Sequence, residues 1–284
     1  MSYARHQTFY LRSGWLAKAL EALPCEPKLF SGDKATVRLG IGKNMVQSLR
    51  FWVRAAGLAH PVSRDKGMEL TRFGEMVYRN DPFFELDLTW WLIHYHIVKD
   101  EHEATSWYYL FNKFSRNEFD RITFIDAVSQ YSGMAVSQSS YQKDYDCIIA
   151  TYVVSERVQG TPEDNTICPL TKLGLLTPMR HNVIRKSSPN TQLPLEVVFL
   201  VLSKASESLH QNISSLLEDP GNIGKIFNLS LDSIYRYLDL LEDKGWLSFS
   251  RTAGIDTISV SAPDAWDLIE SNYKSIQWGD SSEA

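Results

Sequence analysis

This sequence contains few cysteines. It contains neither a long apolar stretch nor an N-terminal segment that resembles a signal peptide. Cys25, Cys147 and Cys168 are its three cysteines, and none belongs to a C-x-x-C pair. An odd number of unpaired cysteines indicates a reducing compartment and not a disulfide framework. No apolar stretch follows the N-terminus, and charged residues interrupt each apolar run before it is long enough to span a bilayer. We therefore expect a cytoplasmic protein that contacts no membrane.

The common catalytic and cofactor signatures are also missing. The chain has no dinucleotide-binding fingerprint, no Ser-His-Asp order and no paired carboxylates in a recognisable setting. Gly40-Ile-Gly-Lys is only faintly like a phosphate-binding loop, because Asn44 follows the lysine where that loop requires Ser or Thr. A turn between two helices is the better interpretation, although Lys43 can still meet a DNA phosphate. We expect no cofactor and no enzymatic activity.

A histidine-rich stretch from His94 to Glu103 suggests a metal site but is better explained by packing. His94 and His96 are two residues apart, so they do not face each other on a helix. Zinc ligands on one helix are instead four residues apart. We expect partly buried histidines that pack against aromatic rings, and no bound metal.

Cys147 and Cys168 invite a second hypothesis, sulfur transfer, which the local sequence does not favour. Cys147 follows Asp144-Tyr-Asp, an acidic setting that raises the pKa of a thiol and lowers its reactivity. Cys168 precedes Pro169 in an apolar stretch. We interpret both cysteines as structural, and keep a sulfur-handling role as the alternative.

The polar stretch before the first expected helix, His6-Gln-Thr-Phe9, offers little chemistry of its own. His6 and Thr8 could form an acid–base pair, but the sequence places no carboxylate nearby to orient the imidazole. We expect Thr8 to cap the first helix and Phe9 to anchor it to the core. Alternatively, His6, Gln7 and Arg12 contact DNA.

The composition is that of an ordinary globular protein with an uneven charge. Hydrophobic residues make up 44% and charged residues 22% of the 284 residues, enough for two or three domains. Residues 1–80 carry 13 Lys and Arg against 6 Asp and Glu, residues 81–190 carry 10 against 14, and residues 191–284 carry 6 against 14. Any phosphate-binding face therefore belongs to the first eighty residues.

The basic region has the pattern of a helix-turn-helix. Helices are expected near 33–39 and 44–56, joined by a tight turn at Gly40-Ile-Gly42. The second helix directs an apolar stripe inward, formed by Met45, Val46, Leu49, Trp52 and Val53. It leaves polar side chains outward, at Lys43, Asn44, Gln47, Ser48, Arg50 and Arg54. Asn, Gln and Arg read purines bidentately, and Lys and Ser suit phosphate, so this face predicts contact with double-stranded DNA.

The segment after this helix predicts a wing. A polar loop from His60 to Gly67 carries Arg64 and Lys66 and precedes a short strand at 68–71, after which Thr71 caps another helix. Such a wing would place both cations over the DNA backbone. The alternative is a three-helix packing unit whose basic face is only solvated.

The last segment repeats this pattern with the opposite charge. Ser230 is expected to cap a helix from Leu231 to Lys244, and strands near 246–250 and 257–260 would form a second wing. The helix exposes mostly acidic residues, at Asp232, Tyr235, Arg236, Asp239, Glu242 and Asp243. Such a face would repel phosphate, so we expect this domain to dock a protein partner or a second copy of the chain.

Several motifs together resemble the bacterial domain-of-unknown-function family numbered four thousand and seven. They are His6-Gln-Thr-Phe-Tyr-Leu-Arg-Ser-Gly-Trp, Leu39-Gly-Ile-Gly-Lys-Asn-Met-Val-Gln-Ser-Leu-Arg-Phe-Trp, Leu70-Thr-Arg-Phe-Gly-Glu, Asp81-Pro-Phe-Phe-Glu, Thr89-Trp-Trp-Leu-Ile-His and Trp107-Tyr-Tyr-Leu-Phe-Asn. The resemblance spans most of the chain. It implies a genome-defence context, notably DNA sulfur modification (phosphorothioation), and it brings no catalytic residue.

The expected protein is mostly α-helical with three domains. Residues 1–80 form a winged helix-turn-helix, residues 81–190 a central helical domain, and residues 191–284 a C-terminal winged helix with a small β-wing. The expected function is that of a DNA-binding accessory or regulatory subunit of a phosphorothioation-type anti-phage defence system, working with other defence proteins. The alternatives are an assembly scaffold that binds no DNA and a transcription factor that regulates its own operon.

Overall fold

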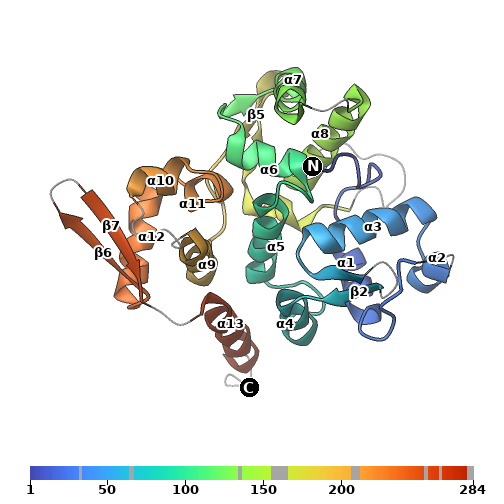
Figure 1. Cartoon of the computed structure of the whole chain (residues 1–284), viewed down its shortest axis with the longest axis horizontal. Helices are drawn as coiled ribbons and strands as arrows, with labels where there is room; N and C mark the ends of the chain where they lie inside the picture. The colour runs from blue at the N-terminus through green and yellow to red at the C-terminus, as the bar shows by residue number, and fades with distance from the viewer. Residues whose placement is uncertain are drawn as a thin grey trace. The chain divides into compact units, whose positions relative to one another are not determined.

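The chain is mostly helical and carries small antiparallel sheets, as Figure 1 shows in a computed structural model. The structure describes residues 1–31, 34–63, 67–133, 136–154, 166–205, 212–252, 255–261 and 264–279. Packing divides the chain into two compact units, one of residues 1–110 and 114–187, the other of residues 111–113 and 188–284. The expected mostly α class is confirmed. The expected division into three domains, with boundaries near residues 80 and 190, remains a prediction.

The first unit begins with three helices and a hairpin. These elements are α1 (Ser13–Ala22), α2 (Lys34–Leu39), α3 (Lys43–Ala55), β1 (Ala59–Ser63), β2 (Gly67–Leu70) and α4 (Arg72–Asn80). Gly40 turns the chain between α2 and α3 at a φ of 65°, which glycine adopts without steric cost. Thr71 caps α4 as predicted, since its hydroxyl accepts a hydrogen bond from the Gly74 backbone N–H at 2.9 Å.

The expected loop from His60 to Gly67 is in part a strand. Residues 59–63 form β1, which pairs antiparallel with β2 so that Ala59 lies opposite Leu70. The sequence did not predict this strand because it contains Pro61, and proline cannot donate a hydrogen bond within a sheet. In a two-stranded sheet both strands are edge strands, and an edge strand tolerates proline.

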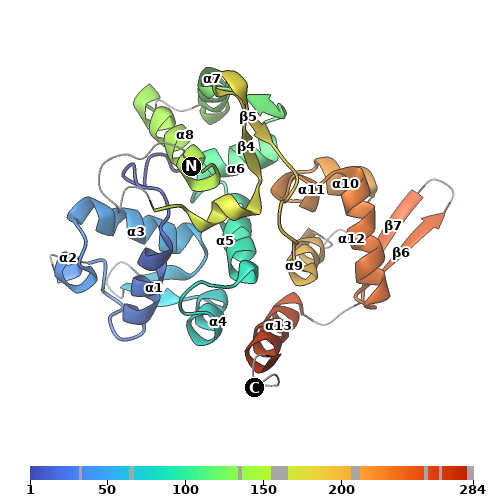
Figure 2. The same cartoon turned by 180° about the vertical axis from the view of Figure 1, so that it is seen from behind.

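The rest of the first unit is an aromatic-rich helical core. It comprises α5 (Asp87–Lys99), α6 (Thr105–Tyr108), α7 (Arg121–Ser132), α8 (Gln138–Tyr152) and the 3₁₀ helix η3 (Pro169–Leu173). The π-helical turn η1 (Tyr109–Lys113) begins in this unit, and its last three residues belong to the second unit. Every side chain of α5 from Leu88 to Val98 is buried, as its unbroken apolar and aromatic sequence predicts. In Figure 1 and Figure 2 the N-terminal segment lies beside α6 and α8.

Three very short strands were not expected. They are β3 (Glu118–Phe119), β4 (Leu176–Pro178) and β5 (Ile184–Lys186), in the order β3-β5-β4, with the 3₁₀ turn η4 (Arg180–Asn182) between β4 and β5. Strands of two or three residues show no measurable alternation in sequence, and the pairing of β3 with β5 joins residues far apart in the chain.

The second unit contains seven helices and strands within its described residues. They are α9 (Leu195–Ala205), α10 (Ile213–Glu218), α11 (Ile223–Ile226), α12 (Leu231–Asp243), β6 (Leu247–Thr252), β7 (Ile255–Val260) and α13 (Ala265–Gly279). Ser230 caps α12 as predicted, because its hydroxyl accepts from the Ser233 backbone N–H. The strands expected near 246–250 and 257–260 are present as the antiparallel β6–β7 hairpin.

Helix α13 was missed although its sequence carried a signal. It packs against α9, and the Asn272 amide donates a hydrogen bond to the Glu196 carboxylate at 2.8 Å. Ala265, Ile269 and Tyr273 recur every four residues and are all buried. Within the described ranges, every helix is too short or too polar to cross a membrane.

Candidate nucleic-acid interface

Helix α3 separates a buried stripe from a polar, exposed face. Val46, Leu49, Trp52 and Val53 are buried, as predicted. The exposed side chains include Lys43, Asn44, Gln47 and Arg50. These four lie on successive turns of one helix, so the structure brings most of the predicted DNA-facing residues onto one surface.

Ser48 does not belong to that surface, and its assignment is corrected. Its side chain is 0% exposed, and its hydroxyl donates a hydrogen bond to the Phe9 carbonyl at 3.4 Å. Residues near Phe9 cover this part of α3, which the helical pattern of α3 alone could not reveal. A side chain held in this way cannot reach a DNA phosphate without unfolding the contact.

Arg54 is only half-exposed and is already paired. Its guanidinium forms an ion pair with the carboxylate of Glu103, which lies in the turn between α5 and α6, and about a third of each side chain is exposed, 34% and 32%. The positive charge that the sequence assigned to DNA is therefore partly neutralised within the protein. Arg64 and Lys66, the two predicted wing cations, lie outside the described residues.

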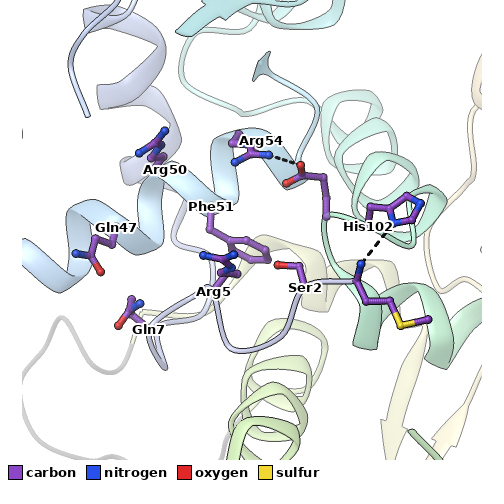
Figure 3. A pocket seen from close by; sticks show the side chains of 10 residues that line it. Ser2, Arg5, Gln7, Gln47, Arg50, Phe51, Arg54 and His102 are labelled. Atoms are coloured by element: carbon purple, nitrogen blue, oxygen red, sulfur yellow. Dashed lines mark hydrogen bonds and ion pairs between the residues drawn. The ribbon is translucent and has the colours of Figure 1, made fainter. Parts of the chain in front are cut away.

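A pocket of about 490 Å³ lies between α3 and the N-terminal segment (Figure 3). Its walls come from residues 1–7, from α3, and from the turn between α5 and α6. The side chains of Arg5, Gln7, Gln47 and Arg50 line it and make no hydrogen bond or ion pair with any other described residue. Among the described residues that line it, Glu103 is the single one with an acidic side chain. The pocket is therefore polar and carries an excess of positive charge.

The N-terminal segment owes its path to a buried polar cluster. His6 is 0% exposed, and its Nε2 lies 2.9 Å from Oδ1 of Asp144 on α8. The same carboxylate accepts hydrogen bonds from the Ala4 backbone N–H at 2.8 Å and from the Ser106 hydroxyl at 2.5 Å. Asp144 thus supplies the carboxylate that the sequence did not place near His6, since the two residues are 138 positions apart.

The hydrogen bonds of His6 also assign its tautomer. Its Nδ1 accepts a hydrogen bond from the Thr8 backbone N–H at 3.1 Å, so the ring carries its proton on Nε2 and donates it to Asp144. With both ring nitrogens engaged and the ring buried, His6 acts as an anchor. One of the sequence-based alternatives expects His6 to contact DNA, but its ring is not exposed at the surface.

The backbone around this anchor is strained. Ala4, Gln7 and Thr8 have positive φ values of 52°, 51° and 72°, a conformation that residues with a Cβ adopt at a cost. The strain is maintained by the hydrogen bonds to Asp144 and by the Phe9 carbonyl, which accepts from the Trp52 indole N–H at 3.0 Å. Strain of this kind persists where the surroundings over-determine a conformation, and it often marks a functional site.

Thr8 does not cap the first helix. Helix α1 begins at Ser13, and Arg12, which is 8% exposed, precedes it. Phe9 does anchor this region through its ring, whose centre lies 5.9 Å from that of Trp15. Burial of Arg12 also removes it from the residues that could contact DNA, whereas Gln7 remains exposed in the pocket.

The histidines of α5 serve as packing residues, as expected. His94 Nδ1 lies 2.7 Å from the Tyr152 hydroxyl, and the His96 ring stacks on Phe73 with centres 5.1 Å apart. His102 is exposed and lines the pocket, where its Nδ1 lies 3.4 Å from the backbone nitrogen of Met1.

Cys147 and Cys168 have the properties of structural cysteines. Both are buried, and burial raises the pKa of Cys168 to about 12. Burial and the nearby Asp144 carboxylate raise the pKa of Cys147 well above its ordinary value. A protonated thiol is a poor nucleophile, so neither cysteine is prepared for sulfur transfer.

Helix α12 presents the acidic face that its sequence predicts. Its exposed side chains include Asp232, Arg236, Asp239, Glu242 and Asp243. Tyr235 is half-buried, with its ring centre 6.1 Å from that of Phe249 on β6. The excess of carboxylates makes this face unsuited to phosphate.

Two solved structures are similar to nearly the whole chain. "Magnesium ion-bound SspB crystal structure" matches with 26% sequence identity and a TM-score of 0.86, covering 97% of this chain and 89% of that one. "SspB crystal structure" matches with 26% identity, a TM-score of 0.84 and the same coverage. No curated protein matches.

The first of those two structures contains a bound magnesium ion. Among the residues that the structure describes, no group of three or more His, Cys, Asp or Glu side chains is arranged to hold a metal ion. The family described as "Protein of unknown function (DUF4007)" matches residues 3–273. The chain belongs to this family.

Proposed function

We propose that this protein is a DNA-binding accessory or regulatory subunit of a bacterial DNA-modification defence system. The observation that carries the proposal is the exposed face of α3, where Lys43, Asn44, Gln47 and Arg50 lie outward without a partner among the described residues. The order α2, turn, α3, β1–β2 hairpin supports a winged helix-turn-helix, in which α3 enters the major groove.

Each outward side chain has a distinct role in this proposal. Asn44 carries an amide that can read adenine, whereas Gln47 and Arg50, which also line the pocket, can meet a base edge or the adjoining backbone. Lys43, at the first position of α3, meets the DNA backbone as a point charge. Arg64 and Lys66 remain proposed phosphate contacts of the wing. No cofactor and no reacting side chain enters the proposal, so the protein acts by binding.

The phosphorothioation context rests on the family to which the chain belongs and on its similarity to the SspB structures. In that context the protein would bring partner enzymes to DNA, or regulate them, in the cytoplasm. The comparison of sulfur-modified with unmodified DNA of the same sequence tests this context separately from DNA binding itself.

The test of DNA binding is a titration of duplex DNA across a salt series. For the full chain we expect affinity to fall steeply with salt, because cations on α3 displace counterions from DNA. Lys43→Ala combined with Arg50→Ala should weaken binding roughly 100-fold near 100 mM salt, on the order expected when two cationic contacts are lost.

Arg236→Ala on α12 is the matched control, since it also removes an exposed arginine from a helix of the same length. It should leave DNA affinity unchanged. If wild-type protein fails to bind duplex DNA even at low salt, the DNA-binding proposal is wrong.

The acidic face of α12 supports a second candidate function, assembly. Its carboxylates fit a basic surface on a partner protein or on a second copy of the chain. In the pure scaffold version, α3 never touches DNA. Co-purification of a partner that is lost in Asp239→Lys, together with absent DNA binding, would establish that alternative.

A further inference from the structure

The pocket beside α3 is more specific than a basic helix face. Two arginines reach it from different segments, Arg5 from the N-terminal segment and Arg50 from α3, and neither has a partner among the described residues. Two unpaired glutamine side chains, Gln7 and Gln47, add N–H donors from the same two segments (Figure 3). Unpaired guanidinium and amide groups that line one hollow are suited to bind an oxyanion.

The ion pair at the edge of the pocket adds a second element. Glu103, the one carboxylate that the described part of the chain places in the pocket lining, pairs with Arg54. Both side chains remain about a third exposed, 34% and 32%, so solvent and ligands reach the pair. Exposed ion pairs contribute little stability, and an entering anion can therefore replace Glu103 as the partner of Arg54 at a small cost.

We propose that this pocket binds a single phosphate group of a DNA strand, and that Glu103 holds Arg54 until the phosphate replaces it. The inference rests on the proposed function in taking the phosphate from DNA. Arg5, Arg50 and Arg54 would surround the phosphate, and Gln7 and Gln47 would donate to it or to the adjoining sugar.

Phosphate is the anion that suits a pocket whose donors come from two chain segments. A carboxylate offers two oxygens on one side, whereas a phosphate accepts hydrogen bonds in several directions at once, as donors from two chain segments require. A pocket of about 490 Å³ also has room for the phosphate with its flanking sugar.

The segment that carries Arg5 and Gln7 is already fixed before any ligand arrives. Both residues flank His6, which is buried and bonded to Asp144. Part of the ordering cost of binding is thus met during folding, which favours affinity.

The test uses the full chain with two probes, a short DNA duplex and inorganic phosphate, at constant ionic strength. Duplex affinity is measured by fluorescence anisotropy, and phosphate binding by the arginine side-chain N–H signals in NMR spectra. Arg5→Gln should weaken duplex binding roughly 5- to 10-fold and reduce the slope of log affinity against log salt by about 0.9.

Glu103→Gln should have the opposite effect. Freeing Arg54 should tighten duplex binding roughly 2- to 5-fold, the range that corresponds to breaking an exposed ion pair. Glu75→Gln is the matched control, because Glu75 is an exposed carboxylate paired with Arg79 on α4 and does not line the pocket. It corrects for the general effect of removing one negative charge.

The outcomes separate this inference from the proposed function. If Lys43→Ala/Arg50→Ala abolishes duplex binding while Arg5→Gln leaves it unchanged and Glu103→Gln behaves as Glu75→Gln, α3 binds DNA and the pocket proposal is overturned. If inorganic phosphate shifts the arginine signals in wild type but not in Arg5→Gln, and no duplex binds, the phosphate site is supported and the DNA function fails. Binding of a poly-glutamate peptide in place of either probe would overturn the phosphate assignment.

Discussion

Helices α3 and α12 make a natural comparison, because they share a backbone arrangement and differ in charge. Each has 13 residues, follows a short helix, ends at a glycine with a φ of 70°, and is followed by a two-stranded hairpin. The same hydrogen bond ends both helices, donated by the backbone N–H of the residue after the glycine. Leu58 donates it to the Val53 carbonyl in α3, and Trp246 donates it to the Leu241 carbonyl in α12.

The surfaces of the two helices nevertheless suit opposite partners. Arg54 and Glu242 each lie three residues before the closing glycine, and they carry opposite charges. Arg54 pairs with a distant carboxylate, while Glu242 accepts a hydrogen bond from the Phe249 backbone N–H of the adjoining hairpin at 2.8 Å. The arrangement of helices therefore does not determine the ligand, and the exposed side chains do.

The first unit contains a buried carboxylate, Asp144, whereas the carboxylates of α12 in the second unit include the exposed Asp239. Asp144→Ala should destabilise the protein by about 3 kcal/mol, because His6 and Ser106 would be left buried without their acceptor. Asp239→Ala on the exposed face of α12 should change stability by less than about 0.5 kcal/mol. Urea unfolding curves measure both, and equal effects would contradict the anchoring role of Asp144.

The two closing glycines provide a finer comparison. At Gly57 a Cβ would collide with the His96 ring, whereas at Gly245 it would meet nothing within 4 Å. Gly245→Ala should cost about 1 kcal/mol from its positive φ alone, and Gly57→Ala about 2 kcal/mol more from overpacking. Thermal or urea denaturation of the two variants gives the difference. Similar losses would show that His96 moves aside freely.

The smallest expected effect concerns the cysteines. Because burial raises the pKa of both Cys147 and Cys168, their thiols stay protonated at pH 8 and should react with a thiol reagent only on unfolding. Exposed Cys25 should react at once. Cys168→Ser should leave DNA binding within about two-fold of wild type, as expected where no contact is lost. A loss of function in the folded variant would revive the sulfur-transfer alternative.

The features that the sequence predicts correctly are local ones. Thr71 and Ser230 cap helices through bonds to residues three positions away, and the α3 stripe repeats within two turns. A reader of the sequence can recognise these because cause and effect lie within a few residues. Most of the polar face of α3 was predicted for the same reason.

What the sequence could not show depends on contacts between distant residues. Ser48 satisfies the outward pattern of α3 but is covered by the N-terminal segment, and Arg54 is paired with a residue 49 positions away. His6 acts as an anchor only through its hydrogen bond to Asp144. The pocket in turn depends on this bond, because the bond fixes the N-terminal segment that forms one of its walls. None of these partners has a periodicity or motif that connects it to α3.

The anchoring of the N-terminal segment has a consequence for the order of assembly. Residues 2–9 are synthesised well before Thr105 and Asp144, to which the backbone N–H groups of Ser2 and Ala4 are bonded. Closing a loop of this length is slow and entropically costly, so the segment docks after the helices it rests on have formed. A chain still emerging from the ribosome has α3 without its pocket, and it becomes competent to hold a phosphate there only once α8 has folded.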